Sequence, residues 1–112
     1  MLMTATADER LDLVFGALAD RTRRQLLAQL TRAPASITEL AAPHDMSLPG
    51  ISKHVRVLEH AGLIRRTIDG RVHRCALDAA AMRAADDWLA RYRVFWTHTL
   101  DALADYVSED PE

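Results

Sequence analysis

A short segment in the middle of the chain combines small, polar and basic side chains in a pattern suited to contacts with nucleic acid. Its apolar residues fall within about 80° of arc on a helix that turns about 100° per residue, and they are Leu48, Ile51, Val55 and Leu58. We predict that these four pack inward. The opposite side would contact DNA through Ser47, Pro49, Gly50, Ser52, Lys53 and Arg56. Small side chains allow close approach to the floor of a major groove, and a lysine can reach a guanine edge or a phosphate. A solvated basic face on an ordinary amphipathic helix is the alternative interpretation.

A basic β-hairpin is predicted directly after this segment. Residues 63–68 and 71–77 are typical of strands, and the Asp69-Gly70 dipeptide between them is typical of a two-residue type I′ turn. Such a turn would pair Ile68 with Arg71, Arg66 with His73 and Ile64 with Cys75. We expect the hairpin to contact backbone phosphate beside the helix through Arg66, Arg71 and Arg74. A hairpin that only keeps the protein in solution is the alternative.

The segments around these two features are predicted to be helical. Periodic apolar residues predict helices over 8–18 and 21–31, the second capped by Asp20, and a Ser36–Glu39 capping box begins a short third helix that ends near residue 42. Ser47 is predicted to cap the segment described above, which would form a helix to about residue 60, and Gly62 would end that helix. Asp78 is predicted to cap a last helix over about 79–107. Two helices joined by a short turn and followed by a hairpin are the plan of a winged helix-turn-helix. We therefore predict a mainly helical α+β fold, with one domain over 8–107 and flexible termini at 1–7 and 108–112.

The last predicted helix is longer than a compact domain of this size. About 28 residues extend roughly 42 Å, against a diameter of about 34 Å for a compact chain of this length. The helix carries five of the six aromatic residues of the chain. We expect a homodimer to bury this surface through the first and last helices, with an interface at Leu11, Phe15, Trp88, Tyr92, Phe95, Trp96 and Leu103. A small-molecule pocket lined by Trp88, Tyr92 and Trp96 is the alternative.

Charge is distributed unevenly, although the net charge is only −2. Residues 51–75 carry six basic and two acidic side chains, whereas residues 76–112 carry three basic and eight acidic ones. This separation indicates a DNA-facing side and a far side that repels phosphate, with chance clustering as the alternative. We recognise no signal peptide and no apolar stretch long enough to span a membrane, so we expect a cytoplasmic protein with no membrane partner.

Catalytic chemistry has no support in the sequence. We recognise no phosphate-binding glycine loop, no metal-ligand set and no nucleophile–base arrangement, so we expect no enzymatic activity. Cys75 is the single cysteine and cannot form a disulfide within one chain. We expect it to be a half-buried structural thiol rather than a redox switch.

Three segments together resemble the ArsR family of bacterial repressors. They are Leu18–Arg24 (LADRTRR), Ser47–Ile64 (SLPGISKHVRVLEHAGLI) and Gly70–Arg74 (GRVHR), and the resemblance extends over about residues 10–107. It implies a winged-helix homodimer that blocks promoter DNA, with DNA-reading roles for Pro49, Ser52 and Lys53. Leu48 stands where family members often carry a polar residue.

The chain departs from the metal-sensing members of that family. Residues 37–42 have neither sulfur nor imidazole, where such members carry a Cys-x-Cys cluster. On the last helix Trp88 stands two residues after Asp86, and the later ligand positions hold Thr99 and Ala102. Trp88, Thr99 and Ala102 offer neither an imidazole nor a carboxylate. The resemblance therefore implies a member without a metal or cofactor.

The sequence thus predicts a transcriptional regulator, a repressor that binds a palindromic operator in double-stranded DNA as a homodimer. A winged-helix module that binds proteins instead of DNA is the alternative. The sequence leaves open the operator and the inducer. Repression could be relieved by an unidentified small-molecule effector, by a thiol reaction at Cys75, or by protein concentration alone.

Overall fold

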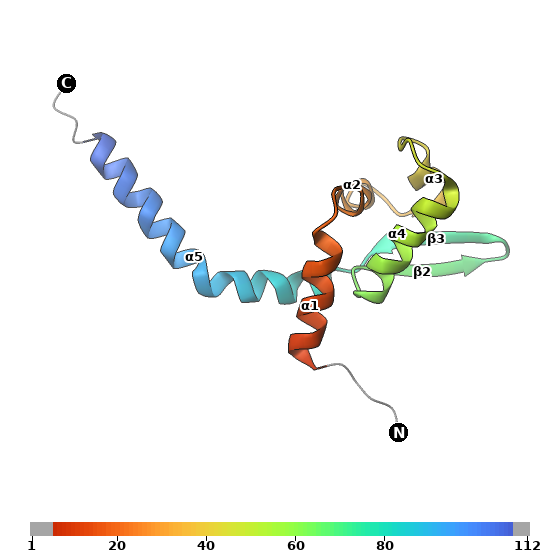
Figure 1. Ribbon diagram of the computed structural model, residues 1–112, viewed down its shortest axis with the longest axis horizontal. Helices are drawn as coiled ribbons and strands as arrows, with labels where there is room; N and C mark the ends of the chain where they lie inside the picture. Colours follow the sequence, from red (N-terminus) through yellow and green to blue (C-terminus); the bar gives the residue numbers. More distant parts are fainter. Residues whose placement is uncertain (1–5, 109–112) are drawn as a thin grey trace.

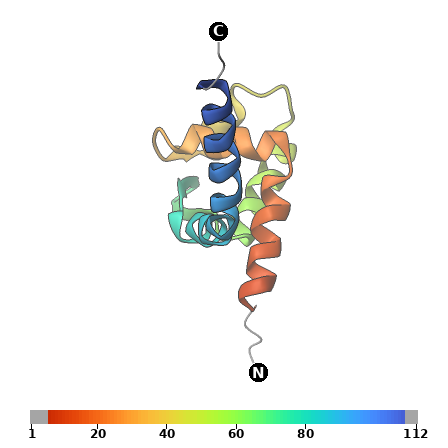
Figure 2. The ribbon, with the colours of Figure 1, turned by 90° about the vertical axis from the view of Figure 1, so that its left-hand side faces the viewer.

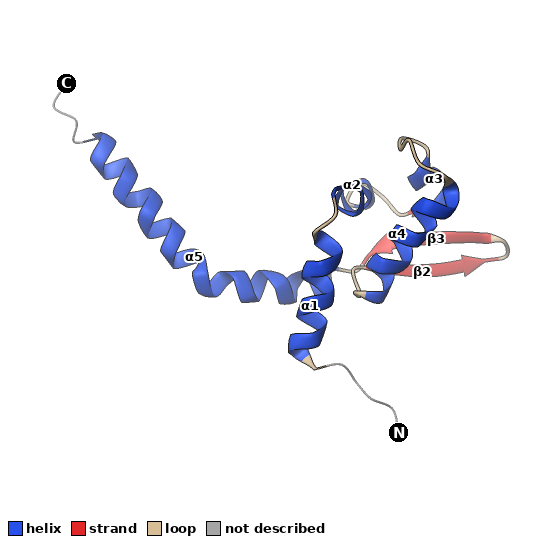
Figure 3. Cartoon of the chain, viewed as in Figure 1, coloured by secondary structure: helices blue, strands red, loops and turns tan. Residues whose placement is uncertain are grey.

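The computed structural model describes residues 6–108, and this part of the chain forms five helices and one three-stranded antiparallel sheet (Figures 1 and 3). The helices are α1 (Ala7–Leu18), α2 (Arg21–Leu30), α3 (Ile37–Ala41), α4 (Leu48–His60) and α5 (Ala79–Ser108). The strands are β1 (Ala35–Ser36), β2 (Ile64–Asp69) and β3 (Val72–Leu77), with β3 in the centre of the sheet. This order confirms the predicted winged helix-turn-helix, although β1 was not anticipated.

The ends of the first and last helices extend slightly beyond their predicted bounds. Thr6 caps α1 through a capping box with Glu9, so α1 begins at Ala7. α5 reaches Ser108. These three terminal residues (Thr6, Ala7 and Ser108) therefore belong to helices or their caps instead of flexible termini. The rest of the segments predicted to be flexible, 1–5 and 109–112, lies outside the described residues.

Side-chain caps fix where α3 and α4 begin. Ser36 accepts a hydrogen bond from the amide of Glu39 at 3.1 Å, and the Glu39 carboxylate accepts one from the amide of Ser36 at 3.0 Å, which confirms the predicted capping box. Ser47 Oγ accepts from the amide of Gly50 at 3.2 Å. These acceptors satisfy amides that have no partner within the first helical turn. The Ser47 cap therefore fixes the residue at which the turn after α3 ends and α4 begins.

The core lies where α1, α2 and α4 meet the base of the hairpin. The largest fully buried side chains are Val14, Leu26, Leu40, Ile51, Val55, Leu58, Leu63 and Cys75. Three of the four apolar residues predicted to face inward from α4 are among them, but the fourth, Leu48, is 49% exposed. Its position explains the difference: Leu48 lies in the first turn of α4, beside a groove between α3, α4 and the hairpin. The prediction that Leu48 packs on the core was wrong.

The register of the hairpin differs from the predicted one by two residues. Ile64 pairs with Leu77 and Arg66 with Cys75, and the pairing ends at Asp69 and Val72. The two loop residues are therefore Gly70 and Arg71, and Gly70 has φ of +62°, at the position that a type II′ turn reserves for glycine. This register brings Leu77 opposite Ile64 at the core; the predicted register would have left Leu77 beyond the end of β2. A shift of two residues leaves every side chain on its predicted face.

α5 packs on the domain only through its first part and then leaves it. Asp78 caps the helix by accepting from the amide of Ala80 at 3.1 Å. Ala85 is buried, and the ring of Trp88 lies edge-on to Phe15 of α1 with centroids 5.5 Å apart. Beyond this point the helix bends and projects away from the other elements (Figures 1 and 2). The molecule consequently extends over 67 × 41 × 20 Å. None of the helices in residues 6–108 is both long and apolar enough to cross a membrane.

Candidate nucleic-acid interface

The cap and the first three turns of α4 present the residues predicted to contact DNA on a single open face. Ser47, Pro49, Lys53 and Arg56 are exposed, while Gly50 and Ser52 are half-buried. The buried residues of the same helix, Ile51, Val55 and Leu58, hold its other side against the core. The amphipathic pattern therefore orients the small and basic residues outward, as the sequence predicted, while their contacts with DNA stay a prediction.

Gly50 has a role that the sequence analysis did not identify. A Cβ at this position would lie 3.2 Å from Ser47 Oγ and 3.3 Å from Cε of Met46. The same Ser47 oxygen accepts the hydrogen bond that caps α4. A glycine at residue 50 thus leaves room for the cap.

A groove of about 510 Å³ separates the start of α4 from the hairpin. Leu48, Pro49 and Ser52 line it from α4, and Arg71, Val72 and His73 line it from the hairpin. Arg66 of β2 and residues 36–38, from the short helix α3 and its cap, complete it. Apolar side chains in the groove are therefore bordered by two arginines and by hydroxyl groups.

Two of the three arginines predicted for the hairpin are free to reach a partner, and the third is not. Arg71 in the turn and Arg74 on β3 are exposed. Arg66, in contrast, donates from Nη2 to Oε1 of Glu59 at 3.1 Å and lies 3.0 Å from Nδ1 of His73 through Nη1. Its side chain is only 14% exposed. Arg66 lies on the hairpin as predicted, but its guanidinium is paired with Glu59 near the end of α4.

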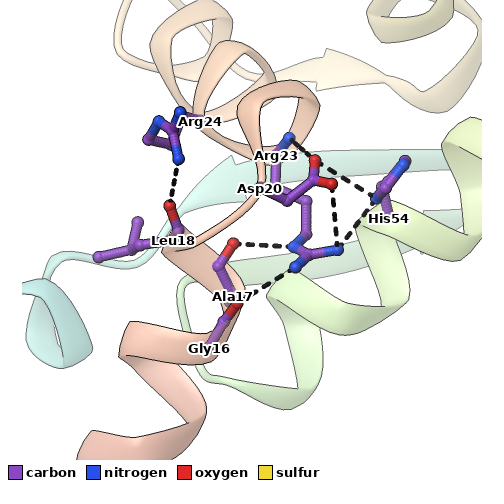
Figure 4. A network of polar contacts seen from close by, with 7 residues as sticks. All are labelled: Gly16, Ala17, Leu18, Asp20, Arg23, Arg24 and His54. Carbon is purple, nitrogen blue, oxygen red and sulfur yellow. Dashed lines mark hydrogen bonds and ion pairs between the residues drawn. The ribbon is translucent and has the colours of Figure 1, made fainter.

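Arg23 forms a network that the sequence analysis did not predict (Figure 4). Its Nε donates to the carbonyl of Ala17 at 2.8 Å and its Nη2 to that of Gly16 at 3.1 Å, both in the last turn of α1. Its Nη1 lies 3.2 Å from Nδ1 of His54 on α4. The guanidinium thus gives the carbonyl of Ala17 a donor at the end of α1, adds a second donor to that of Gly16, which also accepts from the amide of Ala19 at 3.3 Å, and links both to α4. The only sequence signal was that Arg23 falls in a segment carrying the family resemblance.

Asp20 completes this network from the start of α2. Its carboxylate accepts from the amide of Arg23 at 3.0 Å, which confirms the predicted cap. That hydrogen bond, together with the nearby positive charge of Arg23, holds the pKa of Asp20 below its usual value. The carboxylate lies 3.9 Å from Nδ1 of His54. One short loop therefore ties α1, α2 and α4 together behind the candidate DNA face.

The carboxylate of Glu39 is influenced by the charge of Arg74, an exposed arginine of the hairpin. The hydrogen bond from the amide of Ser36 is the main cause that lowers the pKa of Glu39, followed by the Ser36 hydroxyl. The positive charge of Arg74 adds a smaller effect in the same direction. Since β1 brings Ser36 beside Arg74, the unanticipated strand positions this acidic group next to the hairpin.

The residues predicted for the dimer interface divide between packed and exposed. Leu11, Phe15 and Trp88 are half-buried where α1 meets α5. Farther along α5 the exposed fractions are 44% for Tyr92, 67% for Phe95, 44% for Trp96 and 57% for Leu103. A hollow beside Trp88 is lined from α1 by Asp8, Leu11, Asp12 and Phe15, and neither Tyr92 nor Trp96 lines it. The second half of α5 thus lacks a covering surface within residues 6–108.

Cys75 is fully buried at the base of the hairpin, not half-buried as expected. β1 explains the difference, because Ala35 pairs with Cys75 on one side while Arg66 pairs with it on the other. Burial raises the pKa of the Cys75 thiol. In the part of the chain that the structure describes, no three His, Cys, Asp or Glu side chains gather closely enough to hold a metal ion. The carboxylate of Asp86 instead pairs with Arg93 at 2.9 Å.

Comparison with known proteins agrees with this geometry. Residues 18–67 match the model of a helix-turn-helix domain family. The chain is 32% identical over 99 residues to an HTH-type transcriptional regulator of Mycobacterium tuberculosis, over 88% of this chain and 90% of that protein. It is 27% identical over 79 residues to the transcriptional repressor SdpR of Bacillus subtilis, over 70% of this chain and 88% of that protein. A crystal structure of an ArsR family transcriptional regulator is similar with a TM-score of 0.74 and 45% identity, over 80% of this chain and 98% of the other.

Proposed function

Because this chain belongs to the ArsR family of winged helix-turn-helix transcriptional regulators, it is a DNA-binding regulator, and we propose that it represses transcription as a homodimer on an imperfect palindrome. The observation that carries the proposal is the placement of the exposed face of α4 and the tip of the hairpin at one end of the molecule, with α5 projecting from the other (Figure 1). One end would then bind DNA and the other would bind the second copy.

The proposed contacts follow from the exposed groups on α4. Its first turns would enter the major groove, where Pro49 and Ser52 face base edges and Lys53 reaches a guanine or a phosphate. Arg56, one turn farther along the exposed face, would meet the DNA backbone. Ser47 and Gly50 support these contacts by forming the cap that fixes the first turn.

The hairpin would act as the wing. Arg71 and Arg74 are exposed and would contact phosphate beside the groove that α4 occupies. Arg66 is left out of the phosphate-contacting set, because its guanidinium is paired with Glu59. We propose that it positions the wing against α4 instead. No residue is proposed to have a catalytic role.

The homodimer is supported by the apolar surface of α5. Side chains such as Phe95 and Leu103 are mostly exposed in the single chain, and burying a large apolar side chain contributes roughly 1.5–3 kcal/mol. These side chains recur at helical spacing along α5, and a large exposed apolar surface normally marks an interface. A second copy packed about a two-fold axis would place two α4 helices in successive major grooves, about one helical turn apart.

The proposal is tested by selecting bound duplexes from a random library and titrating the enriched duplex over a range of salt. We expect an imperfect palindrome with half-sites about one turn apart, bound by one dimer with a steep salt dependence. The double variant Lys53→Ala/Arg71→Ala removes four cations per dimer, so the log–log salt slope should fall by roughly 3 to 4. Arg10→Ala removes a charge from the exposed face of α1 and serves as the matched control, with an unchanged slope.

Two results would overturn the proposal. One is a double variant that binds the duplex with wild-type affinity and slope, since the proposed DNA face would then be wrong. The other is a folded dimer that enriches no duplex but retains a single protein at a fixed stoichiometry, which would favour a protein-binding module.

A further inference from the structure

The start of α4 carries an apolar surface that neither the core nor the helix cap requires. Leu48 is 49% exposed and Pro49 is also exposed. The cap of α4 is made by Ser47, so no leucine is needed to begin the helix. Val72, which is 46% exposed, faces the same groove from the hairpin. The proposed reading end of the helix therefore begins with an apolar contact surface.

The surroundings of this surface indicate what would cover it. Arg71 lines the same groove, and Lys53 is exposed one turn after Pro49 on α4. A covering apolar peptide would have to desolvate such cations without compensation, which is costly. DNA compensates them with phosphate and still offers one apolar group in the major groove, the C5-methyl group of thymine.

We propose that Leu48, supported by Pro49, contacts the C5-methyl group of a thymine in each half-site and so distinguishes thymine from cytosine at one base pair. This inference rests on the proposed function, because it names the base chemistry read by the same helix. Ser52 and Lys53 can form hydrogen bonds to neighbouring base edges, whereas a leucine can only gain from apolar contact. The methyl group, and not the pairing edge of the base, is then the recognised feature.

The test uses the full-length dimer and the duplex recovered by selection. Each thymine of a half-site is replaced in turn by deoxyuridine, which removes only the C5-methyl group. We expect one position at which the replacement weakens wild-type binding about fourfold, and roughly fifteenfold when both half-sites are changed. Leu48→Ala should bind the thymine and deoxyuridine duplexes with equal affinity.

A control variant and the contrary results distinguish a failure of this inference from a failure of the proposed function on which it rests. Val57→Ala shortens another exposed apolar residue of α4 and should keep the wild-type preference for thymine. If no deoxyuridine replacement weakens binding, or if the preference persists in Leu48→Ala, the inference is wrong while DNA binding stands. If no duplex is enriched at all, the proposed function fails and this inference fails with it.

Discussion

The guanidinium groups of Arg23 and Arg66 are largely buried in contacts with their own chain, whereas those of Arg71 and Arg74 are exposed. A sequence shows which face of a strand carries an arginine, but it does not show whether that arginine is paired with an acidic side chain. For Arg66 the answer depends on Glu59, which precedes it by seven residues and lies on a different element. The hairpin therefore carries fewer free cations than its sequence indicates.

Cys75 gives a prediction about pH at the scale of a single residue. Burial raises the pKa of its thiol in the folded protein, while in the unfolded chain the thiol ionises near a pKa of about 8.5. Its contribution to stability is therefore complete below that value and is lost as the pH rises through the folded-state pKa. We expect the difference in unfolding free energy between wild type and Cys75→Ala to shrink between pH 7 and pH 10.

Urea unfolding at a fixed protein concentration measures this difference. Cys75→Ala has no thiol to titrate, so its unfolding free energy is the reference for the wild-type value at each pH. A difference that stays constant up to pH 10 would show that ionisation of Cys75 does not affect the folded state.

At the scale of elements, the contact between α4 and the hairpin depends on the Arg66–Glu59 pair. We expect Arg66→Ala to lower the free energy of unfolding by about 1–2 kcal/mol, because a charge-assisted hydrogen bond is lost from a partly shielded site. The salt slope of DNA binding should stay unchanged, since this cation is not proposed to contact phosphate. Arg65→Ala removes the exposed neighbour and should leave stability within about 0.5 kcal/mol of wild type.

The same two variants also test the opposite role for Arg66, a contact with phosphate. If Arg66→Ala reduces the salt slope by nearly 2 per dimer and leaves stability unchanged, Arg66 contacts phosphate as the sequence first suggested, and its pairing with Glu59 is incidental.

The helices could be predicted from sequence because their determinants are local. Ser36, Ser47 and Asp78 each cap the helix they were expected to cap, and apolar spacing identified most of the buried side of α4. The hairpin register was not predictable from the turn alone, since Gly70 suits either the first or the second loop position. Packing of Leu77 against the core distinguishes the two registers. The burial of Cys75 likewise depends on β1, a two-residue strand without a sequence signal.

The candidate site was predictable to a similar extent. Residue types and helical spacing were enough to place Ser52, Lys53 and Arg56 on one open face. The exposure of Leu48 was missed because helical periodicity does not say where the core ends along the helix axis. The Arg23 network was missed because it joins His54 to residues far away in the sequence.

At the scale of the whole molecule, the described chain is elongated because half of α5 has no partner within it (Figure 1). The acidic residues gather toward this end of the sequence and the basic ones toward α4 and the hairpin. Within the described residues the projecting part of α5 is not itself an acidic end, because it carries Arg91 and Arg93 as well as Asp101 and Asp105. A dimer joined through α5 would keep the cations of α4 and the hairpin next to the DNA.

If α5 joins the two copies, negative charge introduced on its apolar side should dissociate the dimer. Phe95→Glu/Leu103→Glu should raise the dimer dissociation constant at least about a hundredfold, because four large apolar side chains per dimer lose their burial. Thr97→Glu adds one negative charge per copy outside the apolar side of the helix and serves as the control for added charge. Sedimentation velocity over a dilution series measures the effect, and a double variant that stays dimeric would exclude this surface as the interface.

The Arg23 network has a mechanical consequence. One guanidinium holds the carboxyl end of α1 and the middle of α4 (Figure 4), while Phe15 holds α1 against Trp88 of α5. A tilt of α5 is therefore passed through α1 to α4, unless these contacts break, and the two reading helices of a dimer would turn with their long helices. In a dimer joined through α5, the distance between half-sites that the protein can span would then depend on the angle at which the two α5 helices cross.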